Sequence, residues 1–207
     1  MAVELAELLS AAARGAPPPP DGTVTVRRPP DSRSVGVFAF TAHHVVSADI
    51  DPAWVSGVLD PSDLSAPLSP PFLTALAERT GRSVAPTDLV LVRGRGDESP
   101  PDLVVADGAA HARVERADVR VWTLPGSDDP VLVLGEGVAG RWEVAVEVSR
   151  RARGRGLGRM LFAAAPNLVP PGERVWAQVA PGNPASVRAV LAAGYRPVGA
   201  EALLVPS

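Results

Sequence analysis

The sequence contains no cysteine, no lysine and a single isoleucine. Without cysteine the chain has no disulfide, no thiolate metal ligand and no cysteine nucleophile. Because alanine, glycine, valine and proline are abundant and every basic residue is arginine, the bias indicates a GC-rich coding sequence, so the number of arginines is not itself a functional signal. Apolar runs of about 20 residues, the length of a membrane span, are also absent.

The rest of the composition is that of an ordinary globular protein. The chain has 207 residues, a net charge of −3 and a hydrophobic fraction of 46%, which is typical of one globular domain, with or without an extension. Mild acidity argues against nucleic-acid binding. Met1 to Ala16 carries two glutamates where a signal peptide needs a basic start, so we expect a cytoplasmic protein, either monomer or homodimer, without membrane partners.

One stretch, residues 141–159, organises the second half of the chain. It begins with alternating apolar and polar residues of strand type, passes through a basic turn, and ends in glycines that open a helix at about Leu157. The first turn of a helix carries unpaired backbone N–H groups and a partial positive charge. Gly154, Gly156 and Gly158 let a ligand approach the backbone closely, and the arginines add donors. The pattern predicts a pyrophosphate site.

Two motifs here resemble the GNAT (GCN5-related) N-acetyltransferase family. The first is Arg153-Gly154-Arg155-Gly156-Leu157-Gly158, and the second runs from Asn183-Pro184-Ala185-Ser186 to Ala193-Gly194-Tyr195 and Gly199. The resemblance covers residues 117–207. It implies an α/β fold, α+β in some schemes, with a mixed, mostly antiparallel sheet flanked by helices. We expect residues 1–22 to be a helix and linker, 23–116 an elaborated first part of the fold, and 117–207 the acetyl-CoA-binding core.

The resemblance implies that acetyl-CoA is the co-substrate and that its acetyl group is transferred to a primary amine of a small molecule or peptide by direct attack. The two central strands, 141–148 and 175–179, are expected to splay apart and leave backbone groups for the pantetheine arm. The implied cofactor-binding residues are Val146, Glu147, Val148, Arg153, Gly154, Arg155, Gly156, Leu157, Gly158, Arg159, Asn183, Ser186 and Arg188.

Transfer to an amine needs a base, because an ammonium with a pKa of about 10 must lose its proton. Glu143 and Glu147 lie on one face of the predicted strand, and we prefer Glu143 because it is further from the pyrophosphate end. The alternative is that both are solvated or paired with Arg141 and Arg150. Many family members have a tyrosine as general acid where this chain has Val190, so either another acid or water protonates the thiolate, or catalysis is weak.

Aromatic and histidine residues have less specific roles. Trp142 and Trp176 either wall the acceptor pocket or belong to the core, and Gln178 either binds substrate or its neighbours. His43 and His44 are adjacent and so point to opposite faces of a strand, which argues against a shared metal ion, and His111 is remote in sequence. One of the pair either lines the acceptor pocket or is a residue of a hairpin. We expect no metal site.

Local signals predict the remaining elements. Helices are expected at 3–14, 52–59, 71–79, 157–165 and after Asn183, and strands at 23–28, 35–40, 43–48, 89–92, 119–124, 131–134, 141–148, 175–179, 195–198 and 202–205. The three strands from 119 to 148 should form an antiparallel meander. The first half has more strands than a minimal member of the family, either as a family-specific lid or as a degenerate half-copy of the fold.

Two other functions compete with acetyl transfer. A CoA-binding module without turnover, serving as a sensor or assembly partner, is favoured by Val190 and by the enlarged first half. A dinucleotide-binding oxidoreductase would use the same glycines, but their spacing is G-x-G-x-G and only about fifty residues follow, too few for the remaining strands of that fold.

Overall fold

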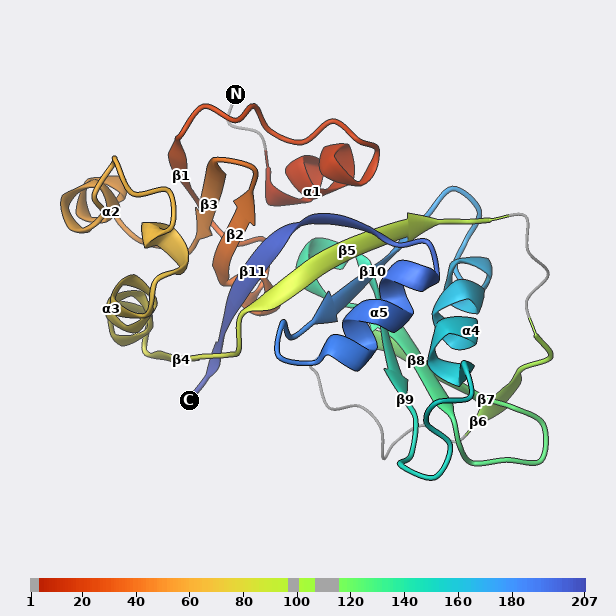
Figure 1. Ribbon diagram of the computed structural model, residues 1–207. Helices are drawn as coiled ribbons and strands as arrows, with labels where there is room; N and C mark the ends of the chain where they lie inside the picture. Colours follow the sequence, from red (N-terminus) through yellow and green to blue (C-terminus); the bar gives the residue numbers. More distant parts are fainter. Residues whose placement is uncertain (1–3, 97–100, 107–115) are drawn as a thin grey trace. The chain divides into compact units, whose positions relative to one another are not determined.

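The computed structural model describes residues 4–96, 101–106 and 116–207 (Figure 1). The chain forms two compact units. The first unit contains residues 1–89 together with 198–207, and the second contains residues 90–197. The segments that the sequence predicts, 1–22, 23–116 and 117–207, divide the chain differently and stay a prediction. Among the described residues, no helix has the length and apolar character needed to cross a bilayer.

Among its described residues, the first unit has five strands and three α-helices. Its elements are α1 (Leu5–Ala13), β1 (Val24–Arg27), η1 (Ser32–Ser34), β2 (Gly36–Phe40), β3 (His43–Ser47), α2 (Pro52–Val58), η2 (Ala66–Leu68), α3 (Pro70–Thr80), β4 (Arg82–Val84) and β11 (Arg196–Pro206), whose first two residues belong to the second unit. The strand order is β1-β3-β2-β11, with β4 on the other side of β11. Only β1 and β3 are parallel among these pairs.

Local sequence signals account for the helices of the first unit. Asp51 caps α2 by accepting a hydrogen bond from the Ala53 N–H, and Pro52 follows it at the first helical position. Gly81 ends α3 in the left-handed conformation, with φ of 65°. Phe72, Leu73 and Leu76 of α3 join a hydrophobic core with residues of β2, β3 and β11. The predicted helices at 52–59 and 71–79 are therefore confirmed.

The described part of the second unit, residues 90–96, 101–106 and 116–197, contains a mixed sheet and two α-helices. Its elements are β5 (Asp88–Gly94), whose first two residues belong to the first unit, β6 (Val104–Ala106), β7 (Ala117–Thr123), β8 (Val131–Glu136), η3 (Val138–Gly140), β9 (Trp142–Glu147), α4 (Leu157–Ala164), η4 (Ala165–Asn167), β10 (Arg174–Val179) and α5 (Pro184–Ala192). The order is β5-β10-β9-β8-β7-β6. The predicted antiparallel meander is present as β7, β8 and β9, and β10 lies parallel to β9.

The prediction for the end of the chain was wrong. Two short strands were expected at 195–198 and 202–205, but β11 is one continuous strand. Gly199 does not interrupt it, because a Cβ there would lie 1.9 Å from the backbone oxygen of Ala39. The glycine lets β2 approach β11 closely. The short strands β4 and β6 were not predicted, and part of the loop expected after Gly94 lies outside the described residues, as does His111.

Candidate functional site

The parallel pair β9 and β10 stops pairing before either strand ends. The backbone register runs from Trp142 and Val175 to Val144 and Ala177, although β9 continues to Glu147 and β10 to Val179. The two strands are therefore no longer paired in their last residues, toward the turn that leads into α4. The splayed strands expected from the sequence are present in this form.

The turn between β9 and α4 has the backbone geometry of an anion site. Gly154 and Gly156 have φ of 77° and 79°, values that glycine adopts without strain. A Cβ at either position would meet no atom within 4 Å, so the space beside the backbone is open to a ligand. Gly156 is also the N-cap of α4, and the first backbone N–H groups of that helix have no partner within it.

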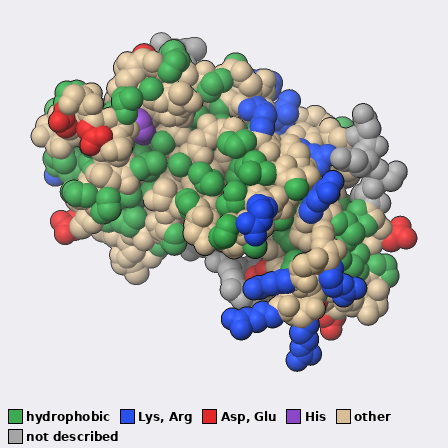
Figure 2. All heavy atoms as spheres, viewed as in Figure 1, with side chains coloured by type: hydrophobic (Ala, Val, Ile, Leu, Met, Phe, Trp, Pro, Cys, Tyr) green, Lys and Arg blue, Asp and Glu red, His purple; other side chains and the backbone are tan. Residues whose placement is uncertain are grey.

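Arginine side chains surround this turn. Arg150, Arg151, Arg153, Arg155 and Arg159 are all exposed. Figure 2 shows blue arginine side chains gathered over the connection between β9 and α4. One of them, Arg153, donates from Nε to the Val148 carbonyl at 3.2 Å, which fixes the start of the turn. The site combines helix-terminal N–H groups with several permanent positive charges.

A groove of about 940 Å³ runs along the turn and the two helices that follow β9 and β10. Its lining includes every residue predicted to hold the cofactor except Arg155. The lining residues are Asp128, Asp129, Val131, Val146, Glu147, Val148, Ser149, Ala152, Arg153, Gly154, Gly156, Leu157, Gly158, Arg159, Phe162, Asn183, Ala185, Ser186, Arg188 and Ala189. The sequence interpretation thus names residues that the structure brings to one place, while their role in binding stays a prediction.

Asn183 and Ser186 reach the groove through a helix cap. The Asn183 side chain accepts a hydrogen bond from the Ser186 backbone N–H at 3.2 Å and so caps α5. Pro184 occupies the first helical position, as the local pattern predicts. The cap holds the beginning of α5 beside the groove, opposite the glycine turn of α4.

The sequence reasoning missed Asp128 and Asp129. The Ser149 backbone N–H donates to Asp129 at 2.9 Å. The Ser149 hydrogen bonds, chiefly from its side chain, hold the pKa of Asp129 below its usual range. The predicted meander could have located these two aspartates, because it places the residues before β8 beside the end of β9, where Val131 pairs with Glu147. Asp129 is therefore ionised at neutral pH and places a negative charge in the lining of the groove.

Glu143 does not line the groove and has the environment of a structural ion pair. Its side chain is 1% exposed. The Arg141 Nε donates to its Oε1 at 2.8 Å, and the Arg116 Nε donates to its Oε2 at 3.2 Å. The Val138 N–H also donates to Oε1, at 3.1 Å. The alternative that paired this glutamate with Arg141 is therefore the arrangement observed.

The electrostatics of Glu143 are unfavourable for a base. Burial alone would raise its pKa, but the charges of Arg141 and Arg116, with a hydrogen bond from Gln178, outweigh burial and lower the pKa. A carboxylate held ionised in this way is a poor proton acceptor. Our preference for Glu143 as the base finds no support in its surroundings, whereas Glu147 is partly exposed and lines the groove.

The predicted substrate-binding residues lie elsewhere. Trp142, Trp176 and Gln178 are absent from the lining of the groove. Trp176 is 3% exposed and packs beneath the Arg141 guanidinium, 5.0 Å from its ring centre. The Gln178 side chain forms a hydrogen bond with Glu143. Contact with its neighbours was the alternative to substrate binding for this residue. Their role toward an acceptor stays a prediction.

The only tyrosine of the chain is a core residue. Tyr195 is 3% exposed, its hydroxyl donates to the Phe162 carbonyl at 3.1 Å, and its ring meets that of Phe162 edge to face. Burial raises its pKa. Val190, at the position of the usual tyrosine acid, is fully buried. Within the described ranges no cluster of three histidine, aspartate or glutamate side chains could hold a metal ion.

The solved structures similar to this chain include two acetyltransferases. The GCN5-related N-acetyltransferase from Kribbella flavida is 21% identical, with a TM-score of 0.44 over 66% of this chain and 65% of that one, so the chain covers slightly less than two thirds of that protein. An acetyltransferase of the GNAT family from Colwellia psychrerythraea is 12% identical, with a TM-score of 0.43 over 78% and 76% of the two chains. No protein-family model and no curated protein matches the chain.

Proposed function

We propose that the chain is an N-acetyltransferase of the GNAT type, which transfers an acetyl group from acetyl-CoA to a primary amine. The observation that carries the proposal is the groove itself. The groove brings together three features: the end of β9 beyond its pairing with β10, a glycine-rich turn with arginines, and the helix that Asn183 caps. Because both similar structures have TM-scores below 0.5, we base the proposal on this geometry.

The residues present fit a pyrophosphate. The open space beside Gly154 and Gly156 admits phosphate oxygens to the N–H groups of the first turn of α4. Arg153, Arg159 and Arg188 line the same groove and add charge-assisted hydrogen bonds. The groove volume of about 940 Å³ is at the upper end of the range for ligand sites, as an elongated molecule such as CoA requires.

The pantetheine arm would extend along β9. Beyond Val144 the edge of β9 that faces β10 has no strand partner in the register. The backbone of Val146 and the N–H of Val148, whose carbonyl accepts from Arg153, can therefore pair with an amide-containing arm, as in an added strand. A backbone N–H in this region would also polarise a thioester oxygen. Acetyl-CoA supplies the activated acetyl group; the protein supplies position and charge.

We propose Glu147 as the base, acting directly or through a water molecule. The amine nitrogen must be neutral to form the new C–N bond while the C–S bond breaks, and Glu147 would accept the ammonium proton. It lines the groove, unlike Glu143. A thiol has a pKa of about 8.5, so water can protonate the departing thiolate without Tyr195 or a residue at position 190.

Calorimetric titration with acetyl-CoA and with CoA tests the cofactor site. We expect micromolar binding to the wild-type protein and none to Gly156→Glu, which places a negative side chain against the phosphates. Gly172→Glu is the matched control, because Gly172 also has a positive φ, 92°, in open space but is not part of the groove. Equal binding by both variants, or no binding by the wild type, would exclude the proposed site.

An alternative function, a CoA-binding module without turnover, is favoured by one observation: the tyrosine hydroxyl is engaged in the core and Val190 is buried. Release of CoA thiol in the presence of a panel of primary amines separates the two functions. Acetyl transfer that Glu147→Gln reduces at least tenfold supports the enzyme. Micromolar binding without transfer to any amine, or hydrolysis alone, supports the module.

A further inference from the structure

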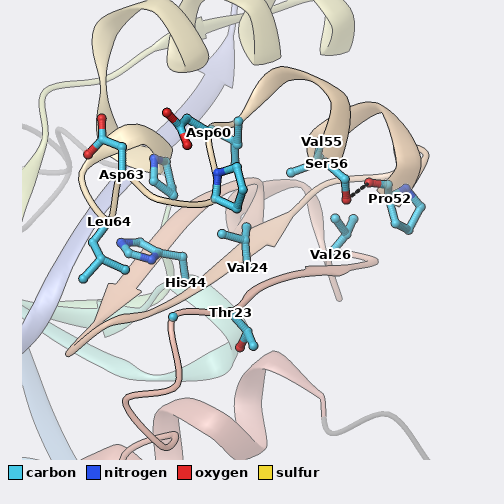
Figure 3. A pocket seen from close by; sticks show the side chains of 14 residues that line it. Thr23, Val24, Val26, His44, Pro52, Val55, Ser56, Asp60, Asp63 and Leu64 are labelled. Carbon is cyan, nitrogen blue, oxygen red and sulfur yellow. Dashed lines mark hydrogen bonds between the residues drawn. The ribbon is translucent and has the colours of Figure 1, made fainter.

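A second cavity lies entirely within the first unit. Its volume is about 440 Å³, and it is formed by β1, β3, α2 and the loop that follows α2 (Figure 3). The lining residues are Gly22, Thr23, Val24, Val26, His44, Pro52, Val55, Ser56, Leu59, Asp60, Pro61, Asp63, Leu64 and Pro67. The size and the largely apolar lining are those of a small-molecule site, in which a few polar groups fix the orientation of the ligand.

His44 is the buried polar group of this cavity. The residue is 6% exposed, and its imidazole makes no hydrogen bond with any other residue in the described part of the chain. Figure 3 shows it beside Leu64, facing the loop after α2. Because the imidazole lines the cavity, it is available for a hydrogen bond from a ligand.

The neighbouring His43 shows the contrast. Its Nδ1 lies 3.0 Å from both Thr23 Oγ1 and Asp21 Oδ1, so its ring is engaged by the protein. Burial, and to a lesser extent the nearby His43, lowers the pKa of His44. The His44 imidazole is therefore neutral near pH 7 and presents one acceptor nitrogen and one N–H donor.

The charged groups of the cavity are all negative. Asp60 and Asp63 lie on the loop after α2, and no arginine is among the lining residues. Hydrogen bonds from the side chains and backbones of Ser62 and Ser65 lower the pKa values of Asp60 and Asp63, respectively. Both carboxylates stay ionised, so the cavity attracts cations and disfavours anions.

We propose that this cavity is a binding site for a small amphipathic amine, whose apolar body packs against Val24, Val55 and Leu64. Its ammonium group donates a hydrogen bond to His44, and Asp60 and Asp63 supply the electrostatic attraction. The site uses none of the residues of the groove in the second unit. It therefore goes beyond the proposed function and does not depend on it.

An NMR titration of the full chain tests the chemistry of the ligand. The probes are 2-phenylethylamine, 2-phenylethanol and 3-phenylpropionate, which share an apolar body and differ in charge. With three histidines in the chain, the imidazole resonances are simple to assign. We expect the amine to shift the His44 signals with the highest affinity, followed by the alcohol, and the carboxylate to be weakest. No shift at His44 with the amine, or equal affinity for all three, would overturn the proposal.

Variants separate this site from its surroundings and from the groove. Asp60→Asn with Asp63→Asn should weaken the amine roughly two- to fivefold, as expected for exposed charges, and leave the alcohol unchanged. Asp49→Asn, at an exposed aspartate outside the cavity, is the matched control.

The His44→Leu variant should lose binding of the amine and of the alcohol alike. If this variant fails to fold, the shift of the wild-type imidazole signals decides. Gly156→Glu should bind the amine normally, so failure of the CoA site leaves this test intact. Weakening by Asp49→Asn equal to that of the double variant would contradict the assigned site.

Discussion

Gly137 lies so close to Glu143 that a Cβ at position 137 would come within 2.1 Å of the Glu143 carboxylate carbon. No side chain fits in that space. The glycine therefore permits the buried carboxylate to reach the Arg116 and Arg141 guanidinium groups and the Val138 N–H. The backbone restricts position 137 as well, because its φ of −109° and ψ of −131° lie outside the main regions that residues with a Cβ adopt.

We expect Gly137→Ala to lower the free energy of unfolding by about 2–4 kcal/mol, because the methyl group displaces a buried carboxylate from its partners. Urea unfolding at pH 7.5 measures the effect. Gly182→Ala is the control: a Cβ there meets nothing within 4 Å, so its stability should change by less than about 0.5 kcal/mol. Equal changes in the free energy of unfolding for the two substitutions would contradict this prediction, because the residues around Glu143 would then have moved to accommodate the methyl group.

Glu143→Gln should destabilise the protein by about 3 kcal/mol at neutral pH, because it leaves two buried guanidinium groups without their counter-charge. The folded pKa of Glu143 is depressed. Its stabilisation is therefore present above the unfolded glutamate pKa of about 4.3 and is lost as the pH falls through the folded value. The wild-type and variant unfolding free energies should converge below about pH 4.

The same variant distinguishes positioning from catalysis. If Glu143 only holds the core, Glu143→Gln should retain CoA affinity wherever it is folded, and the pH dependence of kcat should follow the wild type. Glu147→Gln should show the reverse: little change in urea unfolding and a large loss of kcat. A kcat profile that loses its acidic limb in Glu143→Gln but not in Glu147→Gln would return the base to Glu143.

Much of the fold can be predicted from residues that are close together in the sequence. Asp51 with Pro52, Gly81, and Asn183 with Pro184 mark helix ends by caps that act within a few residues, so these helices could be read from the sequence. The glycine and arginine turn before α4 is equally local. Twelve of the residues that line the groove were predicted for this reason, because they belong to the end of β9, to the turn and to the beginnings of α4 and α5.

Features that depend on distant residues could not be read in this way. Arg116 reaches Glu143 across 27 positions, and only the folded meander brings them together. Gly199 looks like a strand break until its close approach to Ala39 is known. The cavity at His44 needs the loop after α2 to fold over β1 and β3, and no local pattern predicts that contact.

Arg159 and Arg155 offer a matched pair for the phosphate site. Both were predicted to bind the cofactor and both are exposed, but only Arg159 lines the groove. Arg159→Gln should weaken CoA binding roughly tenfold, or about 1.4 kcal/mol, and reduce its salt dependence, whereas Arg155→Gln should change it less than twofold. Calorimetry at two salt concentrations measures both. Equal losses of CoA affinity in the two variants would mean that binding depends on positive charge near the turn and not on contact within the groove.

Asp88 gives the first unit a pH dependence in the opposite sense to Glu143. Burial, and secondarily the charge of Glu201, raises its pKa to about 6. The unfolded carboxyl ionises at about 3.9, so between these values the unfolded state loses a proton that the folded state keeps, and stability falls as the pH rises.

Because Asp88 is only half-buried, we expect Asp88→Asn to raise the free energy of unfolding by roughly 1 kcal/mol at pH 7.5 and not at all at pH 4. Asp88→Glu keeps a titrating group and should keep a slope of the same sign in urea unfolding between pH 4 and 7.5. A gain for Asp88→Asn that is the same at both pH values would show that its effect comes from packing and not from the proton.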